Sequence, residues 1–198
     1  EKEYILLGVG KHTPSFFLIN IINITIMMIF RVDKRKYQVG DTIMPKTSFE
    51  ETMQDEKKEM EDLLNRSRPE NVPERKQCLF LFQDLICALR FYSKYGGIIY
   101  GVSVKEPPYF RGDMNKLDNI LDIFRFSDDN DLRLAAVNEY WKAGTHTFNP
   151  SYEILVSSAC VEKILSEDIS LYKVRDEIRT NGGSVEHTLT YKLLLEKV

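Results

Sequence analysis

The chain has 198 residues, which suits one domain and is long enough to bury a sizeable core without disulfides. Its composition is that of an ordinary globular protein, and its net charge of -3 at pH 7 gives no indication of a nucleic-acid or anionic-membrane partner. Its three cysteines are widely separated and its three histidines are isolated, a pattern that predicts no metal site and favours a cytoplasmic protein with reduced thiols.

The first part of the chain, residues 1–27, is predicted to be an apolar N-terminal extension. Its apolar run is interrupted by Asn20 and Asn23 and falls short of the roughly 20 residues that span a bilayer, so no membrane span is expected. Three interpretations stay open: an added strand pair, a hydrophobic anchor, or an extension ahead of a natural start at Met27 or Met28. A regular pattern of strands and helices begins only after these methionines, which favours the third interpretation.

The rest of the chain is predicted to form a mixed α+β domain at 28–165, with a C-terminal helical segment at 166–198 packed on it. Short apolar runs rich in β-branched and aromatic residues predict strands at 29–32, 78–82, 98–104 and 152–156. Apolar residues at helical spacing predict helices at 48–65, 82–95, 113–124, 131–143, 168–180 and 185–197. A turn or a short strand is expected at 37–41.

Local signals predict where several helices begin and end. Ser48 is followed three residues later by Glu51, which is the spacing of a capping box. Asp113 precedes an apolar stripe and is expected to cap the helix that follows it. Gly96 and Gly97 are expected to end the helix before the strand at 98–104.

One carboxylate stands inside an apolar strand. Glu153 lies in Tyr152-Glu153-Ile154-Leu155-Val156, where an ionised side chain is costly unless it faces solvent, pairs with a cation or takes part in chemistry. From the pattern alone, a solvent-facing or edge-strand glutamate is one interpretation and a catalytic carboxylate is the other.

Two arginines are candidate cations for the same site. Arg31 is a charge within the first apolar strand, and an arginine and a glutamate on two core strands can line one cleft. Arg75 comes just before the strand at 78–82 and can add a second cation, although the solvated entrance of a strand is the plainer interpretation. Tyr140 and Trp141 end a helix shortly before Glu153, either as core residues or as an aromatic wall of the cleft.

Taken in order, these segments resemble the ADP-ribosyltransferase superfamily, and most of all its small bacterial members, which include a DNA-modifying toxin branch and uncharacterised bacterial domains. The resemblance covers about residues 29–165. It rests on the order of Ile29-Phe30-Arg31-Val32, Leu79-Phe80-Leu81-Phe82, Ile99-Tyr100-Gly101-Val102, Glu139-Tyr140-Trp141 and Tyr152-Glu153-Ile154-Leu155-Val156. The last stretch, followed by a short turn and another expected strand, is the most specific.

This resemblance implies an α+β fold with a split β-sheet core, surrounding helices, and NAD in the cleft between the sheets. Glu153 would be the catalytic carboxylate, and Arg31 matches the first-strand Arg or His that contacts NAD. Tyr100 and Tyr140 are candidates for the nicotinamide-stacking tyrosine. Arg75 and Trp141 would complete the set of NAD-binding residues.

The implied activity is cleavage of the nicotinamide–ribose bond of NAD, by an ADP-ribosyltransferase or an NAD glycohydrolase. Bond breaking develops positive charge on the ribose, which a carboxylate stabilises, and an arginine fork suits the pyrophosphate. The acceptor stays open between nucleic acid, protein and small molecule. One alternative is a catalytically inactive member of the fold that acts as a binding or protein-interaction module. Another is an interaction protein or antitoxin-like partner that docks through the N-terminal segment or the C-terminal helices.

Overall fold

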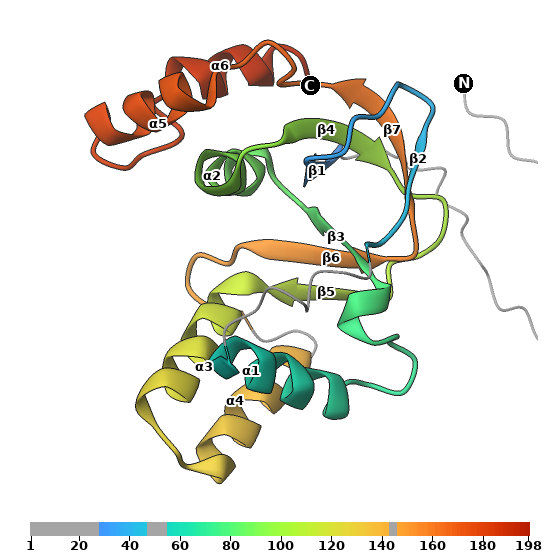
Figure 1. The fold of residues 1–198 in the computed structure, drawn as a ribbon, viewed down its shortest axis with the longest axis vertical. Coiled ribbons are helices and arrows are strands. Elements are labelled where there is room, and N and C mark those ends of the chain that lie inside the picture. The colour runs from blue at the N-terminus through green and yellow to red at the C-terminus, as the bar shows by residue number, and fades with distance from the viewer. Residues whose placement is uncertain (1–27, 47–54, 143–145) are drawn as a thin grey trace, which may run out of the picture.

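The computed structural model describes residues 28–46, 55–142 and 146–198. Within these ranges, six α-helices and a seven-stranded antiparallel sheet form a mixed α+β fold (Figure 1), which confirms the predicted class. The expectations for 1–27, and for a capping box at Ser48 and Glu51, concern residues outside the described ranges.

The sheet has the strand order β2-β7-β4-β1-β3-β6-β5. Its strands are β1 (Ile29–Asp33), β2 (Thr42–Ile43), β3 (Leu79–Phe82), β4 (Ile98–Ser103), β5 (Phe110–Asp113), β6 (Tyr152–Val156) and β7 (Ala159–Ile164). The predicted strands at 29–32, 78–82, 98–104 and 152–156 correspond to β1, β3, β4 and β6. Strand β5 was not predicted, because Phe-Arg-Gly-Asp after two prolines has neither an apolar run nor an alternation of apolar and polar residues.

The sheet is weakly joined in the middle. Five registered residue pairs hold β1 to β4, from Ile29 opposite Val102 to Asp33 opposite Ile98, and four hold β3 to β6. Between β1 and β3 only Phe30 and Phe82 are in register. The strands therefore form two halves, β2-β7-β4-β1 and β3-β6-β5, and Figure 1 shows β3 running between them.

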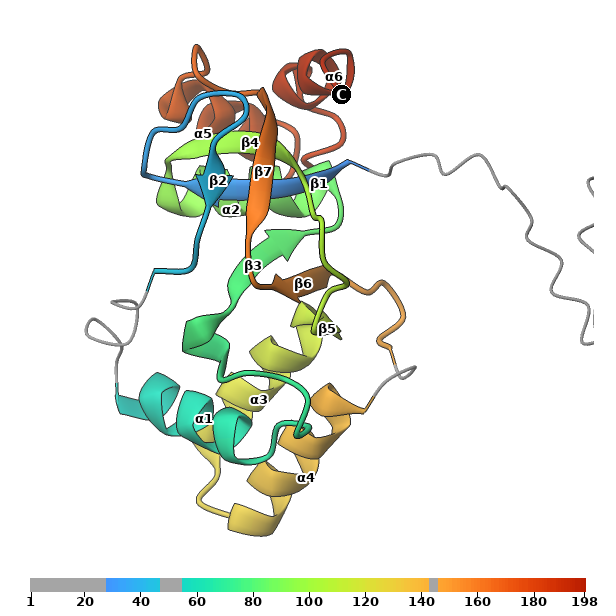
Figure 2. The same ribbon diagram turned by 90° about the vertical axis from the view of Figure 1, so that its right-hand side faces the viewer.

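The helices lie in two groups, one for each half of the sheet (Figure 2). One group contains α2 (Leu85–Tyr95), α5 (Leu171–Thr180) and α6 (Leu189–Leu195), and the other contains α1 (Asp55–Arg66), α3 (Met114–Phe126) and α4 (Asn130–Trp141). Phe30 and Phe82 pack with the first group, and Leu155 packs with the second. A third core cluster, which includes Leu81 and Tyr100, lies among the strands themselves.

Several predicted boundaries are confirmed. The Asp113 carboxylate accepts a hydrogen bond from the Asn115 amide and caps α3. Gly96 follows α2 with a φ of 70°, and Gly97 has a φ of 110°, which is backbone that glycine adopts without a Cβ penalty. The C-terminal segment forms α5 and α6, which contact α2.

Candidate functional site

Glu153 is a buried residue of an interior strand. It lies on β6 between Phe82 of β3 and Gly112 of β5, and its exposed fraction is 5%. It shares its face of the sheet with Leu155, which packs under α1, α3 and α4. The interpretation of Glu153 as a solvent-facing or edge-strand carboxylate is therefore wrong. Its strand β6 is paired on both sides, with β3 and with β5, and its side chain is buried.

The carboxylate of Glu153 belongs to a buried ion-pair network. Arg75 donates from Nη1 to Oε1 of Glu153 over 2.9 Å, and from Nε to Oε2 of Glu61 over 2.9 Å. The Tyr140 hydroxyl donates to the same Oε1 of Glu153 and accepts a 2.7 Å hydrogen bond from Arg75. We call Glu61, Arg75, Tyr140 and Glu153 the buried network; each of them is at most 5% exposed.

The network stays charged at its arginine and neutral at its tyrosine. Burial lowers the pKa of Arg75, but Glu153, Tyr140 and Glu61 together outweigh burial and raise that pKa well above its ordinary value. Burial is the largest cause that raises the pKa of Tyr140 well above its ordinary value. The Arg75 guanidinium also lies over the Phe80 ring, 4.9 Å from its centroid. Arg75 is thus a fixed cation, and Tyr140 is a fixed hydrogen-bond donor to Glu153.

Local sequence explains how these side chains meet. Arg75 begins a 3₁₀ turn just before β3, and Tyr140 lies one residue before the end of α4. Gly112, in register with Glu153, lets the Tyr140 ring approach β5, since a Cβ at Gly112 would come within 2.7 Å of that ring. A side chain at this position would push Tyr140 away from Glu153.

Sequence reasoning missed Glu61, the fourth member of the network. A signal for it was present, because Glu61 is one helical turn from Leu64, on the buried stripe of α1. A carboxylate on the buried side of an amphipathic helix indicates a buried cation elsewhere in the fold.

Trp141 is a core residue. Its indole Nε1 donates to the Leu64 carbonyl over 3.0 Å, and its ring packs 4.7 Å from the Phe110 ring. It is 6% exposed. Of the two interpretations left open for Trp141, the structure therefore supports the core.

Arg31 does not reach Glu153. Phe30, Phe82 and Glu153 are in register across β1, β3 and β6, so their side chains share one face of the sheet. Arg31 is the next residue along β1, so it points to the other face, where it donates to the Phe80 carbonyl over 2.8 Å. The expectation that Arg31 and Glu153 line one cleft is wrong, because successive side chains of a strand alternate between faces.

Tyr100 lies on the Arg31 side of the sheet. It is in register with Arg31 and fully buried. Its hydroxyl donates to the Arg35 carbonyl over 3.0 Å and accepts a 3.1 Å hydrogen bond from the Tyr37 amide. Tyr100 therefore fixes the turn that follows β1, and it is not adjacent to Glu153.

Two arginines hold Asp33 ionised on this face of the sheet. Arg31 and Arg35 approach the Asp33 carboxylate at 3.0 and 2.8 Å. Burial raises the pKa of Asp33, but the hydrogen bonds from Arg35 and the charge of Arg31 outweigh burial and lower the pKa to about 2.

This lowered pKa predicts a defined pH dependence of stability. A depressed carboxylate pKa stabilises the folded state above the ordinary value of 3.8, and the contribution is lost as the pH falls toward about 2. The gap in unfolding free energy between the wild type and Asp33→Asn should shrink by about 2 kcal/mol across that window. Urea denaturation of both proteins from pH 5 to 2 measures this gap. A gap that does not change with pH contradicts the arrangement.

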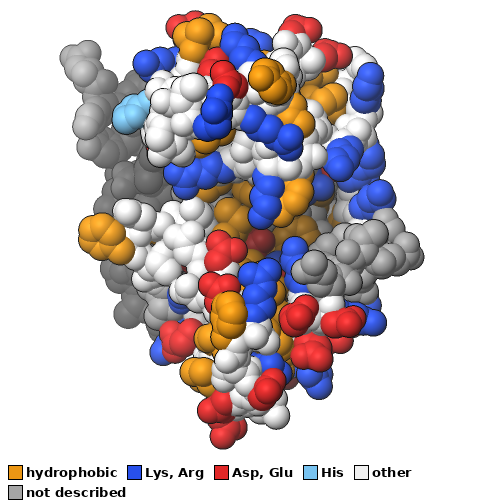
Figure 3. Space-filling view, turned by 60° about the vertical axis from the view of Figure 1, so that its left-hand side comes forward, with side chains coloured by type: hydrophobic (Ala, Val, Ile, Leu, Met, Phe, Trp, Pro, Cys, Tyr) orange, Lys and Arg blue, Asp and Glu red, His pale blue; other side chains and the backbone are white. Residues whose placement is uncertain are grey.

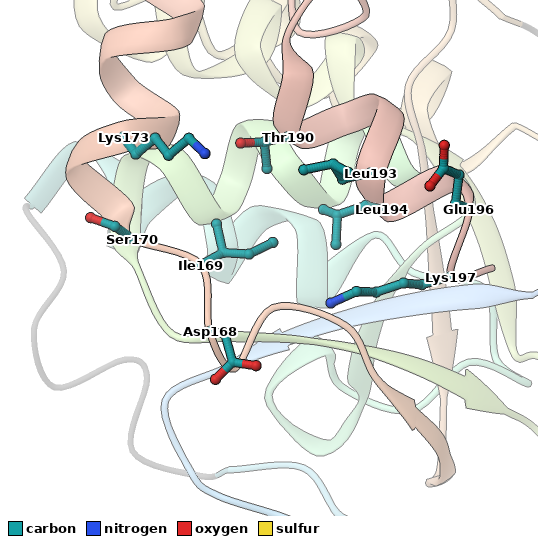
Figure 4. A pocket seen from close by; sticks show the side chains of 9 residues that line it. All are labelled: Asp168, Ile169, Ser170, Lys173, Thr190, Leu193, Leu194, Glu196 and Lys197. Atoms are coloured by element: carbon teal, nitrogen blue, oxygen red, sulfur yellow. The ribbon is translucent and has the colours of Figure 1, made fainter.

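None of the predicted NAD-binding residues lines either of two cavities found at the surface of the described ranges. One, of about 400 Å³, lies between α5 and α6 (Figure 4), with Ile169, Leu193 and Leu194 among its walls. The other, of about 630 Å³, lies between α1, α3 and α4. The buried network thus has the residue types of a catalytic site, but its residues are buried and none of them lines either cavity.

Comparison with known proteins adds no family: no family model matches the chain, and no curated protein matches it. Within the described ranges, no group of three or more His, Cys, Asp and Glu side chains is placed to hold a metal ion. None of the helices seen there has both the length and the apolar character needed to cross a membrane.

Proposed function

We propose that this chain is a protein-interaction module that does not cleave NAD. The observation that carries the proposal is the closed environment of Glu153, whose Oε1 already accepts hydrogen bonds from Arg75 and Tyr140. A carboxylate that stabilises charge on a ribose has to contact that ribose in the transition state. The Glu153 carboxylate instead accepts its hydrogen bonds from side chains of the protein itself.

The position of the second candidate residue supports the same proposal. An NAD site built on Arg31 and Glu153 needs both side chains in one cleft, and the strand register puts them on opposite faces. Arg31 also has protein partners, namely the Asp33 carboxylate and the Phe80 carbonyl. The charged side chains of Arg31 and Glu153 thus contact other parts of the protein and join its strands and helices, which is a structural role.

Nicotinamide release from NAD tests this proposal. We expect the wild type and Glu153→Gln to release no more nicotinamide than buffer does, and titration calorimetry to detect no NAD binding to the wild type. Release by the wild type that falls at least ~100-fold in Glu153→Gln would establish a Glu153-dependent enzyme and overturn the proposal. Circular dichroism of the variant checks that it is folded.

One observation favours NAD cleavage as a second candidate function. The sheet is divided between β1 and β3, where a single register pair joins the halves, and a split sheet is what the resemblance to ADP-ribosyltransferases implies. In that case Arg75 and Tyr140 would hold Glu153 in place, and NAD would have to enter by displacing the helices over β6. Binding of NAD by the wild type, with slower binding on cooling, would support this candidate.

A further inference from the structure

A groove between α1, α3 and α4 lies on the surface, and none of the residues of the buried network lines it. Its volume is about 630 Å³, and its lining includes Glu59, Asp62, Leu63, Phe124, Asp131 and Leu134. Building on the proposed function, we propose that this groove docks a basic amphipathic helix of a partner protein. The groove has an apolar floor, a charged rim and a shape set by helices.

The apolar part of the groove comes from all three helices. Leu63 of α1 and Leu134 of α4 line it, and so does Phe124 of α3. Leu134 is 42% exposed, although Val137 on the same helix is fully buried. α4 therefore carries apolar residues on its exposed side as well as on its core side, which is typical of a helix that contacts a partner.

The rim of the groove is acidic. Glu59, Asp62 and Asp131 are exposed there, and Asp128 and Asp129 stand just before α4. Figure 3 shows several Asp and Glu side chains over the end of the molecule that α1, α3 and α4 form, with hydrophobic side chains and some Lys and Arg among them. This charge favours a partner rich in Lys and Arg, and it repels nucleic acid and anionic lipid.

Two arginines, the exposed Arg66 and the largely buried Arg133, line the groove and offset only part of this charge, because three carboxylates lie in the lining and two more stand just before α4. Arg133 is 13% exposed, and its guanidinium donates to the carbonyls of Ser127 and Phe124. It also stacks on the Phe124 ring, 4.6 Å from the centroid. Arg133 therefore forms part of the floor, and its charge is directed to carbonyls and to the carboxylates of Glu59 and Asp128, at 3.8 and 3.3 Å.

The occupant follows from these features. A groove between two helices accepts a third helix that inserts apolar side chains spaced three or four residues apart. Lys or Arg residues that flank those apolar positions would meet the carboxylates of the rim. A basic amphipathic helix satisfies both requirements at once.

A labelled peptide that carries leucine at helical spacing and lysine elsewhere is the probe for this groove. In fluorescence anisotropy we expect saturable binding to the full chain, weakened at least roughly tenfold by the pair Asp62→Lys and Asp131→Lys. The pair Glu106→Lys and Glu167→Lys changes the net charge equally at exposed sites outside the groove lining. This matched control should bind the peptide as the wild type does. Leu134→Ser should also weaken binding, because the floor loses its exposed leucine.

Two outcomes would overturn the proposal. One is no saturable binding below about 1 mM peptide. The other is equal weakening by both charge-reversal pairs, which would indicate nonspecific attraction to an acidic protein. Nicotinamide release by a chain that still binds the peptide would contradict the proposed function alone. Absence of peptide binding, in a chain that does not cleave NAD, would contradict only the proposal that the groove docks a helix.

Discussion

Arg75→Met is expected to lower the free energy of unfolding by about 3–5 kcal/mol, because it removes one partner of a buried ion pair. The change leaves the carboxylates of Glu61 and Glu153 in the core without the guanidinium that both contact. It also removes a donor to the Tyr140 hydroxyl. Methionine fills much of the space of the arginine stem, so the effect reports the lost charge. Urea denaturation measures it.

The matched control for Arg75→Met is Arg125→Met. Arg125 pairs with Asp122 at 3.5 Å on the surface of α3, with 46% of its side chain exposed. Pairs of this kind contribute about 0–1 kcal/mol, so the control should unfold close to the wild type. Similar losses in both variants would contradict the special role of Arg75.

Asp113→Ala is expected to cost about 2–4 kcal/mol, since it removes a helix cap and leaves buried donors without an acceptor. The carboxylate is 2% exposed and accepts from the amides of Asn115, Thr147 and Ser151 at 3.1, 2.8 and 3.2 Å. It also accepts from the Thr147 hydroxyl at 2.7 Å. These bonds join the start of α3 to the segment that leads into β6. Thermal and urea unfolding measure the loss.

A second aspartate cap supplies the comparison for Asp113. Asp129 caps α4 by accepting from the amides of Asp131 and Leu132, but it is exposed. Asp129→Ala should therefore cost only about 1 kcal/mol, the usual value for a solvated cap. If the two alanine variants are equally stable, the contacts of Asp113 beyond its cap contribute nothing.

Features encoded within a few residues could be predicted from the sequence. The Asp113 cap, the end of α2 at Gly96 and the strand that carries Glu153 depend on neighbouring residues, and the structure confirms them. The mixed α+β class follows from the number and type of such segments. The short strand β5 was beyond this reasoning, because its pairing with β6, and not its own residues, defines it.

The relation between candidate residues depended on strand order and register. Arg31 and Glu153 are 122 positions apart in the printed sequence (153 − 31), and whether they share a face is decided by one pair, Phe30 with Phe82. A shift of one residue at that pair would have reversed the result. Arg75 and Tyr140 were each assigned to the vicinity of Glu153, and the structure brings both to it. Because both side chains donate hydrogen bonds to Glu153, its carboxylate has structural partners and does not face an open cleft.

The most direct test of the account is a double-mutant cycle between Arg75 and Glu153, measured as free energies of unfolding in urea. The three proteins to compare with the wild type are Arg75→Met, Glu153→Gln and the double variant. If Glu153 serves mainly to neutralise Arg75 in the core, the double variant should be more stable than the summed losses predict, by about 1–3 kcal/mol. Losses that add to within about 0.5 kcal/mol would show that the two side chains act independently, and would contradict the structural role of Glu153.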